Sequence, residues 1–191
     1  MRKTKNSLKI IAILCVFLFH LSCYNEIGVD DKSGVVLIIT RIIGSDEQGR
    51  DADYLASDVI TDDGGYETDP VIITVEAKLK KPVPIVPGGT YKTSIMIDRY
   101  YVTFTSPEGD PVPPAFEGRL AAVCEVDSSL DIEVVIVRAE AKTLPPLSTL
   151  VGTTNAIWAV AEIRLVGHDL NGEGVEATGY LTVYFANWVE S

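Results

Sequence analysis

Carboxylates are the side chains of this sequence whose spacing best suits chemistry. Residues 45–69 contain nine Asp and Glu residues and one base, Arg50. Calcium prefers about six to eight oxygen ligands, which closely spaced carboxylates beside a flexible Gly64-Gly65 pair could supply. The candidate ligands are Asp51, Asp53, Asp62 and Asp63. Their spacing matches no EF-hand loop, and a solvated acidic loop with a glycine turn explains the same residues. We favour the loop and predict no metal site.

Motifs for other catalytic chemistry are missing from the sequence. Beyond residue 20, His168 is the only histidine, and the patterns GxSxG, HExxH and CxxC do not occur. Zinc needs three or four ligands, so we expect His168 to be an exposed turn residue. The stretch from Asp169 to Glu173 resembles the start of an EF-hand, but Tyr180 stands at its twelfth position. A glycosidase pair of carboxylates remains open among 27 acids. We predict a non-catalytic protein without a cofactor.

The first 23 residues have the composition of a secretory signal. Four basic residues precede an apolar run, residues 10–21, and the small residue Ser22 stands directly before Cys23. The basic residues are Arg2, Lys3, Lys5 and Lys9. The apolar run is shorter than the roughly 20 residues that span a bilayer. We therefore predict that residues 1–22 form a helical signal peptide that is removed.

This segment resembles the signal of bacterial lipoproteins, with Leu21-Ser22-Cys23 at the position of the lipobox. It departs from the usual pattern at His20, where Leu, Val or Ile is common. The resemblance implies that Cys23 becomes a diacylglyceryl cysteine, that its amine receives a fatty acid such as palmitate, and that the protein is held on a membrane. Tyr24 stands where a retention Asp marks inner-membrane lipoproteins, which favours the outer membrane. An ordinary signal peptide that is cut nearby is the alternative.

Removal of residues 1–22 makes the chain more acidic. It takes four of the 16 Lys and Arg residues and none of the 27 Asp and Glu residues, which leaves a formal charge of −15 on 169 residues. Such a charge disfavours nucleic acid and anionic lipid as partners. Cys124 has no second thiol to pair with and is expected to be a buried apolar residue. The polar residues 23–33 read as a tether that extends at most about 35 Å.

Hydrophobic alternation with a period of two predicts strands along residues 34–191. It is clearest in residues 71–81, 156–167 and 175–187, the last two separated by the glycine-rich residues 168–174. Seven or eight such runs and no amphipathic helix predict one all-β domain, an antiparallel β-sandwich. The last two runs resemble the closing hairpin of bacterial immunoglobulin-like domains, which implies a fold but no function. The apolar residues 143–155 are expected to cover one end of the core, with an exposed partner surface as the alternative.

Outward-facing aromatic residues suggest how such a domain could bind a ligand. Tyr180 and Tyr184 lie on the polar face of the last predicted strand, and Tyr101 could join them. Stacking on sugar rings is one interpretation, and cross-strand pairs on a solvated sheet are the other. We predict a lipid-anchored cell-envelope protein that acts as a structural or protein-interaction module. A small-ligand or glycan-binding lipoprotein is the alternative.

Overall fold

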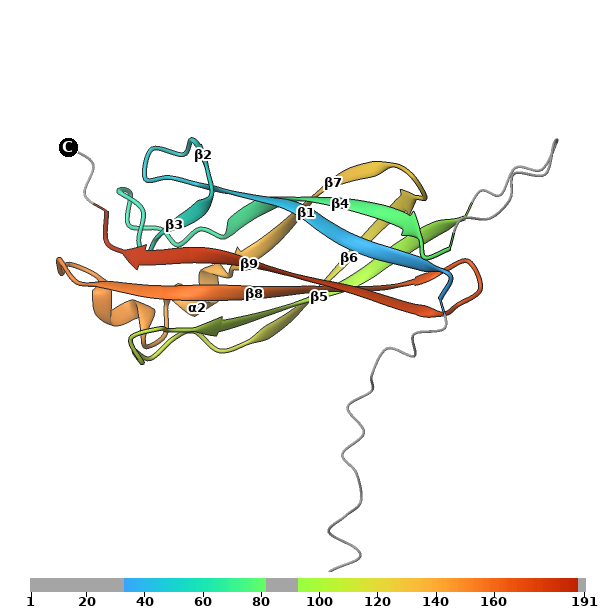
Figure 1. Cartoon of the computed structure of the whole chain (residues 1–191). Helices are drawn as coiled ribbons and strands as arrows, with labels where there is room; N and C mark the ends of the chain where they lie inside the picture. The colour runs from blue at the N-terminus through green and yellow to red at the C-terminus, as the bar shows by residue number, and fades with distance from the viewer. Residues whose placement is uncertain (1–32, 82–92, 189–191) are drawn as a thin grey trace, which may run out of the picture.

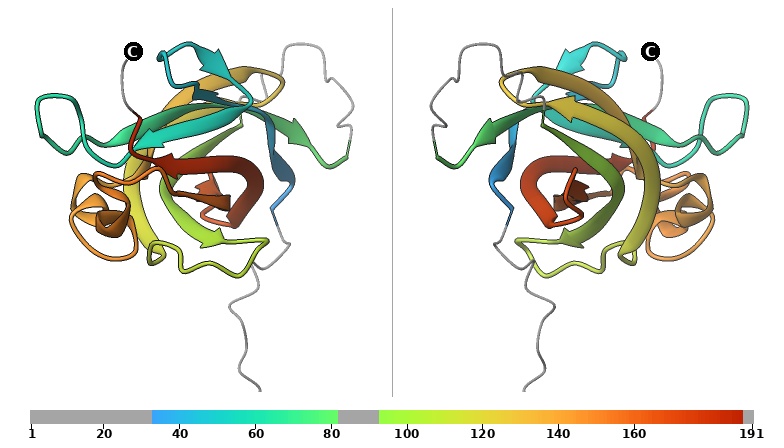
Figure 2. Two further views of the ribbon diagram at one scale, coloured as in Figure 1. Left: turned by 90° about the vertical axis from the view of Figure 1, so that its left-hand side faces the viewer. Right: turned by 90° about the vertical axis from the view of Figure 1, so that its right-hand side faces the viewer.

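The computed structural model describes residues 33–81 and 93–188, which form two β-sheets packed face to face (Figures 1 and 2). The four-stranded sheet has the order β2 (Asp51–Ala52), β1 (Val35–Ser45), β4 (Asp69–Leu79), β7 (Ser129–Val137). The five-stranded sheet has the order β3 (Tyr54–Asp58), β9 (Gly174–Ala186), β8 (Ala156–Asp169), β5 (Ser94–Thr105), β6 (Phe116–Glu125). Two short helices, α2 (Ala139–Lys142) and η1 (Leu147–Leu150), follow β7. The predicted all-β sandwich is confirmed.

The core follows from the alternation in the sequence. Strands β8 and β9 pair antiparallel from Ala156 opposite Ala186 to His168 opposite Gly174, which confirms the predicted hairpin. Their apolar positions all face the other sheet: Ile157, Ala159, Ala161, Ile163 and Leu165 on β8, with Val175, Ala177, Leu181, Val183 and Phe185 on β9. Burial of each large aliphatic or aromatic side chain contributes about 1.5–3 kcal/mol, so these two strands alone supply much of the folding energy.

The acidic residues 45–69 differ from the expected loop because they contain strands β2 and β3. Leu55 is buried opposite Val183, and β3 pairs parallel with β9, so the sandwich is not purely antiparallel. Gly44 makes this possible, because a Cβ there would lie 2.1 Å from the carbonyl oxygen of Tyr54. The described strands therefore number nine, where the sequence predicted seven or eight. A five-residue strand among carboxylates has too short an alternation to be recognised.

Strands β6 and β7 are consecutive in the chain but belong to different sheets. Between them Asp127 adopts a positive φ of 61°, and its backbone N–H donates to the carbonyl of Ala77 on β4 at 2.8 Å. These contacts turn the chain from one sheet to the other instead of into a hairpin. The two edge strands then lie side by side and close one flank of the sandwich, as the end-on views in Figure 2 show.

The sandwich has two ends that differ in the elements they carry. At the entry end, where the described chain begins, the Ser33 hydroxyl donates to Asp169 in the β8–β9 turn at 2.8 Å. Asp169 is paired with Ile95, and Phe104 lies nine residues further along β5, about 30 Å away. The far end carries α2, η1 and the loops after β1, β3 and β5 (Figure 1).

The signal peptide, Cys23 and most of the tether lie outside the described residues. Within residues 33–81 and 93–188, no helix has the length and hydropathy to cross a membrane.

Candidate functional site

The three tyrosines proposed as ligand contacts all lie on the outer face of the five-stranded sheet. The Arg164 guanidinium lies over the ring of Tyr101 on β5, with its central carbon 4.7 Å from the ring centroid. Tyr180 of β9 is opposite Glu162 and is 63% exposed. Tyr184 is four residues further along β9, about 13 Å away. The tyrosines therefore share a face but do not form one cluster.

The compact aromatic group on this face is a different set, which we call the aromatic row: Tyr54, Tyr184 and Trp158. The rings of Tyr54 and Tyr184 meet edge to face, with centroids 5.6 Å apart and an interplanar angle of 80°. Trp158 is directly opposite Tyr184 in the β8–β9 register, and both remain exposed. The alternation of β8 already placed Trp158 outward, between the inward residues Ile157 and Ala159. Tyr54 was missed because β3 was interpreted as loop.

A shallow depression of about 430 Å³ adjoins this face near the start of β6. Its floor combines an aromatic ring with hydroxyl and charged groups, contributed by Tyr101, Thr103, Ala115, Phe116, Glu117, Glu162 and Arg164. Such a mixture can stack on an apolar ring face and also bond to hydroxyls. The depression is therefore mixed in character, and Tyr101 is the only one of the three predicted tyrosines that lines it.

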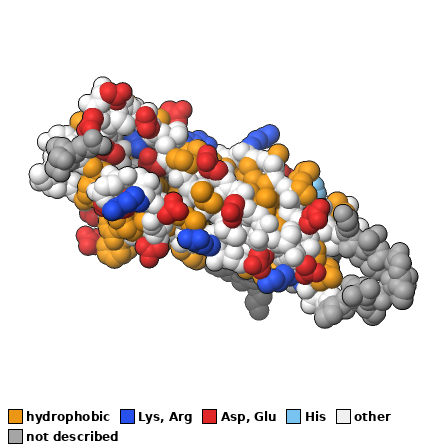
Figure 3. Space-filling view, turned by 90° about the horizontal axis from the view of Figure 1, so that it is seen from above, with side chains coloured by type: hydrophobic (Ala, Val, Ile, Leu, Met, Phe, Trp, Pro, Cys, Tyr) orange, Lys and Arg blue, Asp and Glu red, His pale blue; other side chains and the backbone are white. Residues whose placement is uncertain are grey.

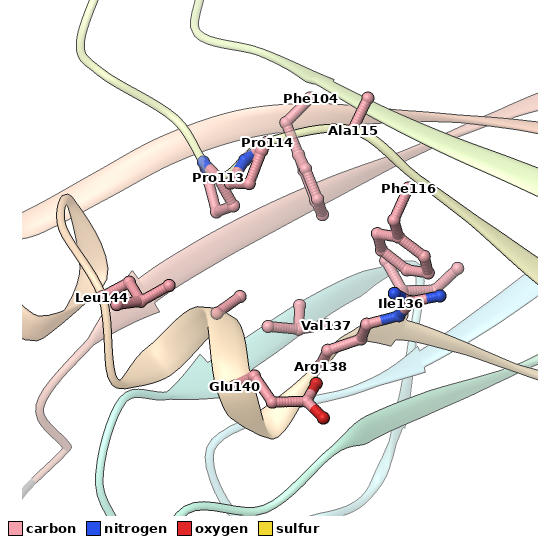
Figure 4. A pocket seen from close by; sticks show the side chains of 11 residues that line it. Phe104, Pro113, Pro114, Ala115, Phe116, Ile136, Val137, Arg138, Glu140 and Leu144 are labelled. Atoms are coloured by element: carbon pink, nitrogen blue, oxygen red, sulfur yellow. The ribbon is translucent and has the colours of Figure 1, made fainter.

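The second hollow is an apolar groove at the far end (Figure 4). This far-end groove has a volume of about 210 Å³ and lies between the loop after β5, the end of β7 and helix α2. Its lining is Phe104, Pro113, Pro114, Ala115, Phe116, Ile136, Val137, Arg138, Glu140, Ala141 and Leu144. Leu144 is 58% exposed. A contiguous apolar surface of this kind marks interaction sites more often than a single exposed leucine does.

Arg138 fixes one wall of the far-end groove. Its guanidinium lies over the Phe116 ring, 4.1 Å from the centroid, and donates to the backbone carbonyl of Glu117. Phe116 in turn meets Tyr100 edge to face, with centroids 6.3 Å apart. The Arg138 guanidinium therefore already interacts with an aromatic ring and a backbone carbonyl. These contacts fix this wall of the groove in the unbound protein.

A buried ion pair holds the opposite wall. Lys142, at the end of α2, is only 1% exposed, and its Nζ is 3.0 Å from both carboxylate oxygens of Asp69 on β4. The Ser57 hydroxyl also donates to Asp69, at 2.6 Å. Burial raises the pKa of Asp69 above its ordinary value, and the Lys142 charge opposes that rise. The pair ties α2 to strands of both sheets.

The segment after α2 completes the far end. Leu147 and Leu150 of η1 are buried against the core, as predicted for an apolar segment that covers it. Leu144 of the same segment instead remains exposed at the groove. One side of the segment therefore packs inward, as expected, and the other side faces solvent. The alternative of a partner surface stays a prediction.

Negative charge surrounds the far-end groove. The two segments that line it, residues 104–117 and 136–144, contain four acids and two bases, and the bases are the already engaged Arg138 and Lys142. The acids are Glu108, Asp110, Glu117 and Glu140. The nine acids of residues 45–69 lie in the neighbouring strands and loops. Acidic side chains are correspondingly dense at the left end of Figure 3.

The proposed calcium ligands do not converge. Asp63 accepts hydrogen bonds from the Thr61 hydroxyl at 2.5 Å and from the Gly65 amide at 3.1 Å, and the Thr61 bond is the main reason that its pKa is lowered. Asp51 lies in β2, whereas Asp62 lies in the turn before β4. Across residues 33–81 and 93–188, no three His, Cys, Asp or Glu side chains lie close enough to hold a metal ion.

The remaining chemically active side chains have structural surroundings. His168 is on β8 rather than in the turn, with Nδ1 3.7 Å from an Asp98 carboxylate oxygen. Cys124 is buried, as expected, and burial raises the pKa of its thiol. A buried thiol with a raised pKa is a poor nucleophile.

No protein-family model and no curated protein matches this chain.

Proposed function

We propose that this protein is a non-catalytic lipoprotein of the cell envelope that presents a binding surface to another protein. Cys23, lipidated after removal of residues 1–22, anchors the chain, and the outer membrane is the favoured location. The domain is an immunoglobulin-like sandwich that carries the binding surface away from the anchor. The order of basic, apolar and small residues before Cys23 supports the anchor.

One observation carries the binding role: an exposed apolar groove lies at the far end, about 30 Å from where the chain enters the domain. The groove is lined by residues of two separate segments, 104–117 and 136–144, and is kept in shape by the Arg138 and Lys142 contacts. A preformed surface binds more tightly than one that must be ordered first. Its position leaves it accessible when the entry end faces a membrane.

The second candidate function is glycan binding, and the aromatic row favours it. Tyr54, Tyr184 and Trp158 lie on neighbouring strands of one sheet face, with Tyr184 and Trp158 exposed and Tyr54 half-buried against Tyr184. Hydroxyl and charged groups lie further along the same face, including Thr182 and Glu162. Aromatic faces next to hydrogen-bonding groups suit pyranose rings, which have both apolar and hydroxyl surfaces.

The anchor is tested by fractionation of bacteria that express the whole chain. Cys23→Ala should move the protein from the membrane to the soluble envelope fraction, because no acyl chains remain to hold it. Cys15→Ala is the matched control and should stay with the membrane. If the Cys23→Ala protein still sediments with membranes and enters detergent extracts, another segment anchors it.

A further inference from the structure

We propose that the far-end groove binds a segment of a partner protein in which one large apolar side chain is flanked by Lys and Arg residues. This inference rests on the proposed protein-binding function and specifies the chemistry of the partner. The apolar residue enters the groove beside Leu144, and the basic residues face the surrounding carboxylates.

The size of the groove indicates an anchoring side chain rather than a whole small molecule. Its volume is about 210 Å³, below the roughly 300–1000 Å³ of pockets that enclose small ligands. A hollow of this size holds one or two apolar side chains. Protein interfaces commonly concentrate their affinity in such an anchor, seated in a small well-packed pocket.

The charge around the groove selects the flanking residues. Glu140 lines it, and the loop that supplies Pro113 and Pro114 also contains Glu108 and Asp110. The positive groups in the lining segments are engaged, because Arg138 lies on Phe116 and Lys142 is buried against Asp69. An approaching segment therefore meets carboxylates, while the cations of the lining segments are engaged. Complementary charge accelerates association and excludes acidic competitors.

The same charge argues against other occupants. A second copy of this chain would bring another strongly acidic far end against the first, which costs repulsion. An anionic lipid surface would be repelled in the same way. The floor of the groove is apolar, with Phe104, Val137 and Ala141, and offers few hydroxyl partners to a sugar.

The test uses the full mature protein in nanodiscs of zwitterionic lipid, which do not attract charged peptides. The probes are two short fluorescein-labelled peptides with a central Leu-Phe pair, one flanked by Lys-Arg pairs and the other by Glu-Asp pairs. Fluorescence anisotropy should show at least about tenfold tighter binding of the basic peptide, and this preference should decline at high salt. Leu144→Ser should weaken its binding about tenfold. Leu170→Ser, an equally exposed leucine at the entry end, should leave it unchanged.

The outcomes separate this inference from the proposed function. If both peptides bind equally and Leu144→Ser weakens both, the groove is a protein-binding surface but the basic partner is wrong. If neither peptide binds, or Leu144→Ser changes nothing, both the inference and the groove-based function are overturned. Sedimentation of the same samples measures whether the protein dimerises through the groove. A dimer that is lost in Leu144→Ser would show that a second copy of the chain, and not the proposed basic segment, occupies the groove. Glu140→Gln provides the finer check, since it should weaken only the basic peptide.

Discussion

The two ends of the sandwich each depend on a carboxylate, fully buried at Asp169 and largely buried at Asp69, but they satisfy it differently. At the far end, Asp69 faces the ammonium group of Lys142, and its pKa is raised because burial outweighs that charge. At the entry end, burial alone would raise the pKa of Asp169. The Ser33 hydroxyl and the amides of Asn171 and Glu173 donate to this carboxylate and together lower its pKa.

The difference shows how each end is assembled. Asp169 closes a hairpin with local amide donors and one hydroxyl from the entering chain, so it organises the end at which the described chain enters the domain. Asp69 and Lys142 are 73 residues apart in sequence and join β4 to the helix beside the groove. A local turn can form alone, whereas the ion pair forms only when both sheets and α2 are assembled. The far-end groove, the proposed binding surface, is therefore a part of the molecule that depends on the complete fold.

Lys142→Ala should have the largest effect on stability. It leaves Asp69 buried without a counter-charge, which costs about 3–5 kcal/mol. The loss should be greater at pH 7 than at pH 4, because the unpaired carboxyl has a raised pKa in the folded state and its contribution to stability declines as pH rises through that value. Urea unfolding, followed by circular dichroism at both pH values, measures it.

Lys78→Ala is the matched control, because Lys78 forms an exposed ion pair with Glu76 and its loss should change stability little. The double variant Lys142→Met with Asp69→Asn should recover part of the loss, since no buried charge remains. A Lys142→Ala protein as stable as the parent would show that the pair does not hold the far end.

Asp169→Ala should cause the second-largest loss of folding stability, about 2 kcal/mol, because three hydrogen bonds to a buried carboxylate are lost. A lowered folded-state pKa means that the stabilisation is present above the ordinary value of 3.8 and is lost as pH falls through the folded-state pKa. The difference between parent and variant should therefore shrink below about pH 4. Thermal unfolding from pH 3 to pH 7 tests this, with exposed Asp98→Ala as the control. A difference that grows on acidification would contradict the assignment.

Trp158→Ala should have a small effect on stability, about 1 kcal/mol or less, because the side chain is on the solvent face. It provides the test of glycan binding at the aromatic row. If that second function operates, neutral oligosaccharides should change the fluorescence of the parent protein, and Trp158→Ala should abolish binding. Tyr180→Ala, outside the row, should retain it. Unchanged fluorescence across the oligosaccharides would remove the glycan hypothesis and leave the far-end groove as the binding surface.

The sequence predicted the parts of the fold that repeat with a period of two. Strands β8 and β9 and their turn follow directly from alternating residues such as Ile157 and Trp158. Strand β3 was not predicted, because Leu55 is its one large apolar core residue among carboxylates and small side chains. The sequence could not predict that β6 and β7 belong to different sheets. A strand shows the same alternation of buried and exposed residues in whichever sheet it lies.

The candidate site was predicted only in part, because its elements are distant in sequence. Tyr184 was recognised from its own strand, but its neighbour Tyr54 is brought beside it by a parallel pairing. Residues 143–155 were recognised as apolar. Nothing local indicated that Leu144 would line a groove with Phe104 and Pro113. The ion pair between Asp69 and Lys142 likewise has no local signature, because a lysine near the end of a polar stretch is normally solvated.

Photo-crosslinking in intact cells would capture a protein partner that docks at the far end. A photoreactive amino acid replaces Leu144 at the groove or, in a matched variant, Leu170 at the entry end, both of which are exposed. We expect a discrete protein adduct from position 144 that Glu140→Gln diminishes, and no such adduct from position 170. Equal adducts from both positions, or an adduct from position 170 alone, would contradict it.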